Sequence, residues 1–362
     1  MNAKAQRLSS GRLPLTCSAV AGLLYGLAFL PATALAQTPP NPAPEAIAPA
    51  LLQLQHDDAR LQNIGWQLIR SNAPFCTETR PAIGLLVQDA RDYSDPASIR
   101  KALGITGNVF VGAVPTGSPA EAAGLRAGEE LAAVNGKNLA RTYIEPGQGA
   151  PAAQAALARA LARNREVSLT LRDQAGKMRD IQVESVKVCP GQFALTAGSR
   201  AAQSDASRIL IGQAFAASDR PSDKLEESEL AAVVAHELAH VLLHHSQWLD
   251  QAGHGDEHVH ASEREADRLA VWLLANAGYD PAAMVRLLRG WGRRNDPGLA
   301  RLPTHGSWED RAALVEQEIV TMRATWATSG KADWQRLFSR EPALVRLPSA
   351  LCKKPDARCK RR

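Results

Sequence analysis

The sequence has little excess charge of either sign, and only one hydrophobic run approaches the length of a membrane span. It holds 42 basic and 37 acidic residues, a net charge of +5. Three basic residues lie in the first 12 positions, and the last ten positions add six basic residues and one acidic residue. The remaining body therefore carries a charge near −3. Nucleic-acid binding needs a positive surface, so the body predicts no nucleic-acid partner.

Composition is otherwise that of an ordinary globular protein, with 45% hydrophobic and 22% charged residues. These values exclude wholesale disorder, a collagen-like chain and a polytopic membrane protein. At 362 residues, the chain is long enough for about two domains of ~100 to 200 residues each.

The one long hydrophobic run lies near the N-terminus and predicts a secretory signal peptide over residues 1–36. A basic start is followed by the apolar stretch 13–30 and then by Ala34-Leu35-Ala36, a small-x-small cleavage site. We predict cleavage after Ala36, export to the periplasm, and no transmembrane segment after the leader. A retained membrane anchor is the alternative, although the run is shorter than the ~20 apolar residues that a span requires.

Cysteines are few, and Cys17 belongs to the leader. Because Cys17 precedes most of the apolar stretch, we do not expect it to carry a lipid. The other four cysteines, Cys76, Cys189, Cys352 and Cys359, form an even set that suits two disulfides in an oxidising compartment.

Patterning after the leader divides the chain into blocks. Leu54, Leu61, Ile64 and Leu68 recur at helical spacing, so their helix must pack its apolar stripe on a larger body. Short strand-like runs follow, separated by Gly, Pro and Asp turns, and the last block is helical apart from an apolar run at 209–211. The predicted blocks are a proline-rich linker (37–49), the amphipathic helix (50–76), a β-rich domain (81–188), a helical domain (189–345) and a basic, cysteine-containing tail (346–362). The predicted strands are 83–87, 109–114, 130–134, 167–172 and 181–188, with an alanine-rich helix at 151–163.

The β-rich block resembles a PDZ domain of the kind associated with bacterial proteases. The resemblance rests on the string from Ser118-Pro119 to Ala127-Gly128 and on the Asn135-Gly136 turn that follows. It implies that an extended chain end, such as a C-terminal peptide, adds to a sheet edge beside the helix 151–163, with its carboxylate held by the loop Ile83-Gly84-Leu85. The alternative is that Gly84 is only a turn glycine and the domain a spacer.

If this domain is an insertion whose ends meet, Cys76 and Cys189 flank it and should form a disulfide across its base. Cys352 and Cys359 would then pair with each other across the basic tail.

A His-Glu-x-x-His motif lies within a predicted helix spanning residues 229–245. His236 and His240 are four residues apart and project from one helix face, close enough to bind one cation. Glu237 lies one step around the helix, where it can reach a metal-bound water. His244 and His245 prolong this helix, and we expect them to support the ligands from behind or to lie on the surface.

The third ligand must come from elsewhere in the chain. The metzincin pattern requires Gly and His where Leu243 and Ser246 stand, so that class is excluded. A downstream segment offers Glu263 as a ligand, with Asp267 on the same helix face to accept the distal N–H of a ligand histidine. Glu265 points elsewhere on that helix, and we expect it to be solvated.

These motifs resemble the HtpX-like zinc peptidases, the type 1 CAAX prenyl-protease family within the gluzincins. The resemblance implies an α+β fold with a mainly helical zincin-like domain and a small edge sheet, interrupted here by the PDZ-like domain. It implies one Zn²⁺ per chain on His236, His240 and Glu263, with Glu237 as general base. Many relatives carry transmembrane helices; their lack after the leader favours the exported relatives that act on envelope proteins.

A segment resembling the family's Thr-His-Pro-Ser motif lies at residues 304–307 and is followed by the matching Arg311. His305 would approach the zinc or the tetrahedral oxyanion as a catalytic residue, and Arg311 would support the ligands. The alternative for His305 is a helix cap or a solvent-facing side chain.

The predicted function is an exported zinc endopeptidase that hydrolyses misfolded or mislocalised envelope proteins, with the PDZ-like domain recruiting or positioning its protein and peptide substrates. Zinc lowers the pKa of its water, and Glu237 takes the proton and passes it to the leaving amine. Substrate should pair with an edge strand, which we predict at residues 208–211. The alternative is a non-catalytic, chaperone-like binding protein with a structural zinc site.

Overall fold

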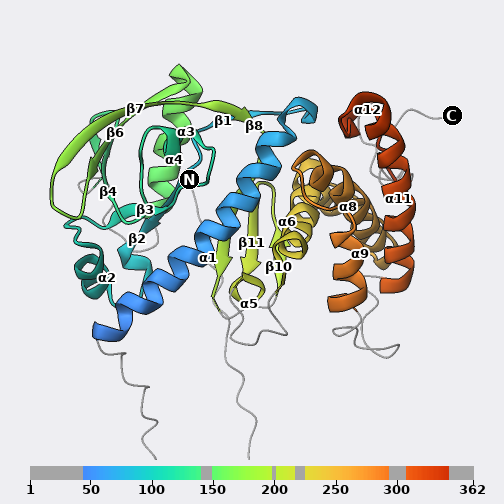
Figure 1. Ribbon diagram of the computed structural model, residues 1–362, viewed down its shortest axis with the longest axis horizontal. Helices are drawn as coiled ribbons and strands as arrows, with labels where there is room; N and C mark the ends of the chain where they lie inside the picture. Colours follow the sequence, from blue (N-terminus) through green and yellow to red (C-terminus); the bar gives the residue numbers. More distant parts are fainter. Residues whose placement is uncertain (1–43, 140–148, 198–200, 217–224, 293–306, 342–362) are drawn as a thin grey trace, which may run out of the picture. The chain divides into compact units, whose positions relative to one another are not determined.

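A computed structural model describes residues 44–139, 149–197, 201–216, 225–292 and 307–341 (Figure 1). The fold is α+β, as predicted: a β-rich domain, the one that resembles a PDZ domain, precedes the greater part of a mainly helical domain that carries a small sheet. The predicted leader, His305, Cys352 and Cys359 lie outside the described residues. No helix in the described ranges is both long and apolar enough to cross a membrane.

Helix α1 (Pro44–Ser71) begins inside the segment that the sequence predicts to be an extended linker. Proline is compatible with the first turn of a helix, and the residues between Pro44 and Pro49 include helix-favouring alanines. Three of the four residues of the predicted apolar stripe are buried, since Leu61, Ile64 and Leu68 are each at most 1% exposed, whereas Leu54 is only partly buried. These side chains belong to the core of the helical domain, so α1 is part of that domain although it lies before the PDZ domain in the sequence.

The PDZ domain is built on one antiparallel sheet with the strand order β2-β3-β4-β6-β7. Its core forms where alternating apolar residues of the strands meet helix α4, a pattern clearest in β6. The strands are β2 (Leu86–Asp89), β3 (Val109–Ala113), β4 (Glu130–Val134), β5 (Lys137–Asn138, paired with β4), β6 (Glu166–Arg172) and β7 (Met178–Glu184). The short helices are η1 (Ala73–Phe75), just before the domain, and η2 (Ala90–Asp92), α2 (Pro96–Leu103) and α3 (Pro119–Ala122); the longest is α4 (Gly149–Asn164).

The two ends of the inserted segment meet. Strand β1 (Arg80–Ala82) pairs antiparallel with β8 (Val186–Val188), and a disulfide joins Cys76 to Cys189 with a Cα–Cα distance of 5.7 Å. The predicted disulfide is therefore present. The predicted strand 181–188 is divided in two, because Ser185 separates β7 from β8. The strand predicted at 83–87 begins only at Leu86, because Gly84 turns the chain between β1 and β2 with φ of +72°.

The helical domain carries a three-stranded sheet with the order β10-β11-β9. Strands β9 (Gln192–Thr196) and β11 (Arg208–Gly212) are parallel, and β10 (Ala202–Ser204) is antiparallel to β11. Residues 208–211 therefore form the central strand, and the prediction that they form an edge strand is wrong. The actual edge, β10, has the sequence Ala-Gln-Ser and so gives no hydrophobic strand signal.

The remaining helices enclose a core in which α6 and α8 pack side by side. They are α5 (Gln213–Ala216), α6 (Glu227–Leu242), α7 (His245–Ala252), α8 (Asp256–Asn276), α9 (Ala283–Leu287), the π-helical turn η3 (Leu288–Gly292), α11 (Trp308–Ser329) and α12 (Trp334–Leu337).

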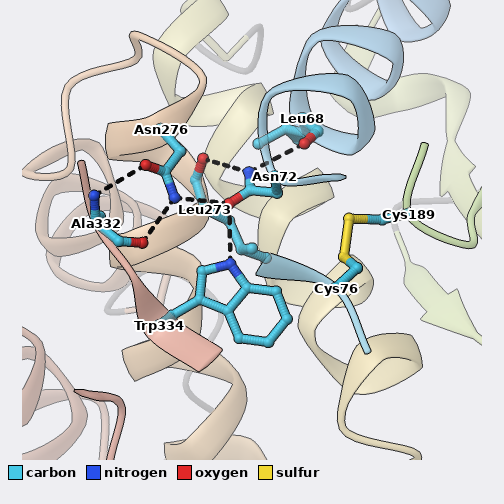
Figure 2. The surroundings of a disulfide bond; sticks show 8 residues. All are labelled: Leu68, Asn72, Cys76, Cys189, Leu273, Asn276, Ala332 and Trp334. Atoms are coloured by element: carbon cyan, nitrogen blue, oxygen red, sulfur yellow. Dashed lines mark hydrogen bonds between the residues drawn. A yellow bond between two sulfur atoms is a disulfide. The ribbon is translucent and has the colours of Figure 1, made fainter. Parts of the chain in front are cut away.

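A buried asparagine joins the end of α1 to this helical core, near the disulfide (Figure 2). The amide nitrogen of Asn72 donates to the carbonyls of Leu68 and Leu273, at 3.0 and 3.1 Å. Its oxygen accepts from Asn276 Nδ2 at 2.9 Å and from Trp334 Nε1 at 3.0 Å. The whole hydrogen-bonding capacity of the side chain is thus used between α1, α8 and α12.

Candidate metal centre

Three potential metal ligands meet where α6 packs on α8. His236 and His240 lie one turn apart on α6, and Glu263 faces them from α8. The two histidine Nε2 atoms are 3.1 Å apart, and the Glu263 carboxylate oxygens lie 3.5 Å from His236 Nε2 and 3.4 Å from His240 Nε2. All three side chains are largely buried, with 12 to 15% of their surface exposed.

This triangle of donor atoms has the dimensions of a zinc site. Ligand atoms at about 2.0 to 2.1 Å from a tetrahedral zinc ion are about 3.3 Å from one another. The two histidine nitrogens are 3.1 Å apart, and each lies 3.4 to 3.5 Å from one Glu263 oxygen, Oε2 for His236 and Oε1 for His240, so all three separations are close to that value. Two imidazole nitrogens and one carboxylate oxygen are also a donor set that suits zinc and leaves a fourth position open.

His236 is held from behind by a buried ion pair. Its Nδ1 lies 2.9 Å from Asp267 Oδ1, and Arg311 of α11 contacts the same carboxylate through Nε and Nη2 at 2.5 and 2.8 Å. The predicted positions of Asp267 and Arg311 behind the ligands agree with this arrangement. Arg311 also approaches Glu263, with Nη2 3.4 Å from Oε2.

The electrostatics of the ligand set favour a positive charge at its centre. Burial by itself lowers the pKa of His236, but Asp267 and Glu263 outweigh it and raise that pKa to about 10. Burial opposes ionisation of Asp267, yet Arg311 and His236 hold its pKa below the usual range. The carboxylates thus stabilise positive charge at this position, whether it is a proton on His236 or a bound zinc ion.

Glu237 follows His236 on α6 and is buried, with 7% of its surface exposed. Its position one residue further around the helix places it beside the face that carries the two histidines, as the motif predicts.

Behind His240 the structure differs from the sequence prediction. Helix α6 ends at Leu242 instead of continuing to 245, because His244 adopts a left-handed conformation with φ of +57°. The chain turns there, α7 begins at His245, and the His245 ring returns to His240 with 2.8 Å between their Nδ1 atoms. His245 is 1% exposed, and burial lowers its pKa to about 4, so the ring is neutral.

Glu265 is fully buried, and the prediction that it is solvated is wrong. Its Oε2 lies 2.9 Å from His245 Nε2, and Arg340 donates to both of its oxygens at 2.7 and 2.9 Å. Burial raises the pKa of Glu265, but His245 and Arg340 outweigh that effect and lower it. No sequence pattern predicts this contact, because Arg340 lies 75 residues beyond Glu265 and belongs to no recognisable motif.

In the PDZ domain, the predicted carboxylate-binding loop is tightly packed. Ile83 is buried and its carbonyl accepts from the backbone N–H of Ala120 at 2.9 Å. A Cβ added to Gly84 would lie 2.4 Å from Ser118 Cβ, so glycine is required here by both φ and space. Leu85 is partly buried against the core. This turn is compatible with both interpretations of Gly84, and peptide binding by the loop stays a prediction.

Strand β2 forms one edge of the PDZ sheet, with β3 as its only neighbour among the described strands, and α4 packs beside it. This is the location that the PDZ resemblance implies for an added peptide strand.

Comparison with known protein families identifies two domains. Residues 110–172 match the family model described as PDZ domain, and residues 222–278 match the peptidase M78 model, described as IrrE N-terminal-like domain. The second match contains all three potential ligands and Glu237. No curated protein is significantly similar to the chain.

The chain thus carries a PDZ domain and a metallopeptidase-type domain of zincin-like character. Neither match is to the HtpX-like family, so that more specific relationship stays a prediction.

Proposed function

We propose that this protein is an exported zinc endopeptidase of the His-Glu-x-x-His plus Glu type, related to the HtpX-like gluzincins. The donor triangle of His236, His240 and Glu263 carries the proposal, because its dimensions and donor types match one zinc ion. The M78 match over the same residues supports a peptidase-type domain.

In this proposal the chain's own residues divide the work at the site. When bound, zinc acidifies a water molecule and draws electron density from the substrate carbonyl. Glu237 takes the proton from the attacking water and delivers it to the leaving amine nitrogen. Asp267 orients His236, and Arg311 fixes Asp267. His305, which lies outside the described residues, would be an additional catalytic residue.

Substrate would bind in an extended conformation along β10. This strand is one edge of the small sheet, and it packs against α6, which carries the histidines. The opposite edge, β9, packs against α1 and is thereby covered. Pairing through backbone groups would make cleavage weakly dependent on substrate sequence.

The PDZ domain, proposed to span 81–188, would recruit or position protein substrates through the β2 edge and the loop Ile83-Gly84-Leu85. The peptidase domain would combine the helix of residues 50–76 with residues 189–345, followed by the tail 346–362 in which Cys352 pairs with Cys359. Signal cleavage after Ala36 would deliver the protein to the periplasm, where misfolded or mislocalised envelope proteins are its substrates.

A non-catalytic role is the second candidate function, because members of the IrrE-like family include regulators as well as peptidases. A chaperone-like protein could retain zinc for structure alone. The presence of Glu237 beside an open coordination position favours the enzyme, since a structural site has no use for a general base.

The test is to compare the mature wild-type protein with Glu237→Gln for zinc content and for cleavage of casein. We expect both proteins to bind one zinc per chain and only the wild type to cleave casein, because glutamine cannot accept the proton. Equal cleavage by both would contradict the role of Glu237. A zinc-loaded wild type that cleaves neither casein nor unfolded envelope proteins would favour the non-catalytic function.

A further inference from the structure

A continuous row of buried polar contacts leads from His240 to the C-terminal part of the described chain. His240 Nδ1 contacts His245 Nδ1 at 2.8 Å, and His245 Nε2 contacts Glu265 Oε2 at 2.9 Å. Glu265 accepts two hydrogen bonds from the Arg340 guanidinium, at 2.7 and 2.9 Å, and one from the backbone N–H of Glu341, at 2.7 Å. His245 and Glu265 are at most 1% exposed, so water does not compete for these contacts.

The chemistry of these groups fixes which nitrogen carries each proton. A carboxylate paired with a guanidinium is ionised and accepts only, so His245 Nε2 must be the donor to Glu265. When His240 Nε2 binds the metal, the one N–H of the His240 ring is on Nδ1, so the 2.8 Å contact requires His245 Nδ1 to be the acceptor. His240 Nδ1 therefore donates to His245, and the lone pair of His240 is on Nε2, the atom that faces Glu263 and His236.

We propose that His245 is a positioning residue for the zinc site: held by Glu265 and Arg340, it accepts the Nδ1 proton of His240 and thereby presents His240 Nε2 to the metal. The proposal rests on the zinc site of the proposed function and adds to it a histidine outside the ligand set. His236 has a carboxylate, Asp267, in the corresponding place, whereas His240 has a second histidine backed by a carboxylate.

The same contacts make the C-terminal strap, defined as residues 338–341, part of the site. Arg268 of α8 donates to the Ser339 carbonyl at 2.8 Å and lies 3.3 Å from the Glu341 carboxylate. Its guanidinium also stacks over the Phe338 ring at 5.1 Å. These contacts hold the strap against α8, where Arg340 reaches Glu265 from outside the core, with 37% of its side chain exposed. Occupancy of the zinc site should therefore depend on a residue that contacts no metal ligand.

Two amide variants of His245 separate the two halves of this arrangement. In His245→Asn the amide oxygen takes the place of Nδ1, so the acceptor for His240 is retained and the contact with Glu265 is lost. In His245→Gln the amide nitrogen takes the place of Nε2, so the contact with Glu265 is retained and the acceptor for His240 is lost. The measurements are zinc affinity, by competition with a chelator, and the visible absorption spectrum of the Co²⁺-substituted mature protein.

We expect His245→Gln to bind zinc about 10 to 100-fold more weakly and to alter the Co²⁺ spectrum, as other partners of ligand histidines do. His245→Asn should lose less affinity. The control is His254→Ala, which removes an exposed histidine from the same region and should change nothing. Equal losses in the two amide variants, or a His245→Gln affinity within twofold of wild type, would overturn the proposal.

Arg340 provides a test that leaves the histidines untouched if the His245 variants do not fold. Arg340→Ala should weaken zinc binding, Arg340→Lys should restore part of the affinity, and the exposed Arg336→Ala is the matched control. An unchanged zinc affinity in Arg340→Ala would contradict the proposal that Arg340 holds His245 in position through Glu265. A wild-type protein that binds neither zinc nor cobalt would instead contradict the proposed function itself.

Discussion

Arg311 and Asp267 form a two-point buried ion pair, in which the guanidinium of α11 grips both oxygens of a carboxylate on α8. The pair lies directly behind His236, whose Nδ1 is 2.9 Å from Asp267. Helix packing between α8 and α11 is thus coupled to the orientation of a potential metal ligand.

This coupling predicts an order of zinc affinities among acidic variants of α8. Glu263→Ala removes a donor atom and should nearly abolish zinc binding, whereas Asp267→Ala removes only the support of His236 and should weaken binding about 10 to 100-fold. Glu257→Ala, which removes an exposed carboxylate from the first turn of the same helix, is the control. Zinc content measured by elemental analysis after dialysis decides the order, and equal content in Glu263→Ala and Glu257→Ala would refute the ligand assignment.

A second prediction concerns Asp58, which α1 buries against the PDZ domain. Burial raises its pKa to about 6, although Gln88 Nε2 donates to it at 2.7 Å. The pKa of this carboxyl is higher in the folded state than its unfolded value near 3.8, so the folded protein binds the proton more tightly than the unfolded chain. Ionisation of the group therefore destabilises the fold. The free energy of unfolding should therefore fall as pH rises from about 4 to about 6, by up to about 3 kcal/mol from this group.

The variant Asp58→Asn keeps an acceptor for Gln88 and has no charge to bury. We expect it to be more stable than wild type at pH 7 and to lose this part of the pH dependence, as measured by urea unfolding across pH 4 to 8. Asp250→Asn, at an exposed position, serves as control. If the free energy of unfolding changes between pH 4 and 6 in the same way in the wild type and in Asp58→Asn, the pKa of Asp58 is not raised and the prediction is wrong.

The disulfide yields a third prediction. Cys76 and Cys189 close a loop with a sequence separation of 113, for which chain-entropy estimates give up to ~4.7 kcal/mol. The double variant Cys76→Ser/Cys189→Ser should unfold at lower denaturant concentration than the oxidised wild type. Peptide mapping without reductant should recover the Cys76–Cys189 pair; a link from either cysteine to Cys352 or Cys359 would contradict the observed pairing.

The fourth prediction addresses Asn72, whose side chain makes four buried hydrogen bonds (Figure 2). Asn72→Ala leaves the indole N–H of Trp334 without this partner, at a cost of about 1 to 3 kcal/mol for an unsatisfied group. The Leu273 carbonyl keeps the N–H of Ala277, so the other three lost hydrogen bonds cost only about 0.5 to 1.5 kcal/mol each. We expect a loss of roughly 2 to 5 kcal/mol in thermal or urea unfolding, against no measurable change for the exposed Asn164→Ala. A loss below 1 kcal/mol would show that water replaces the amide.

Local patterns were enough to predict much of this structure. The spacing of His236 and His240 places both on one helix face whatever the surroundings, because a helix repeats every 3.6 residues. The strict alternation in β6 likewise determines which of its side chains face the core.

Contacts that depend on chain reversals or on strand order could not be predicted in the same way. His245 can contact His240 only because His244 adopts a left-handed backbone conformation. That conformation is uncommon for residues other than glycine, so it could not be predicted at a histidine. Strand β10 is at the edge of the sheet because of how separate segments pair. Its short polar sequence does not predict a strand at all. The burial of Glu265 depends on an arginine far along the chain.

The junction at Cys76 and Cys189 has a practical consequence for protein engineering. Consecutive Cα atoms are about 3.8 Å apart, so the 5.7 Å between these two residues can be bridged by a linker of one or two residues. The entire intervening segment can therefore be excised or exchanged for another domain without moving either end of the remaining chain. Such a deletion would expose the face of α1 that now meets the segment at Asp58 and Asn63, and a graft would have to supply partners for these side chains in place of Gln88 and the Thr116 backbone.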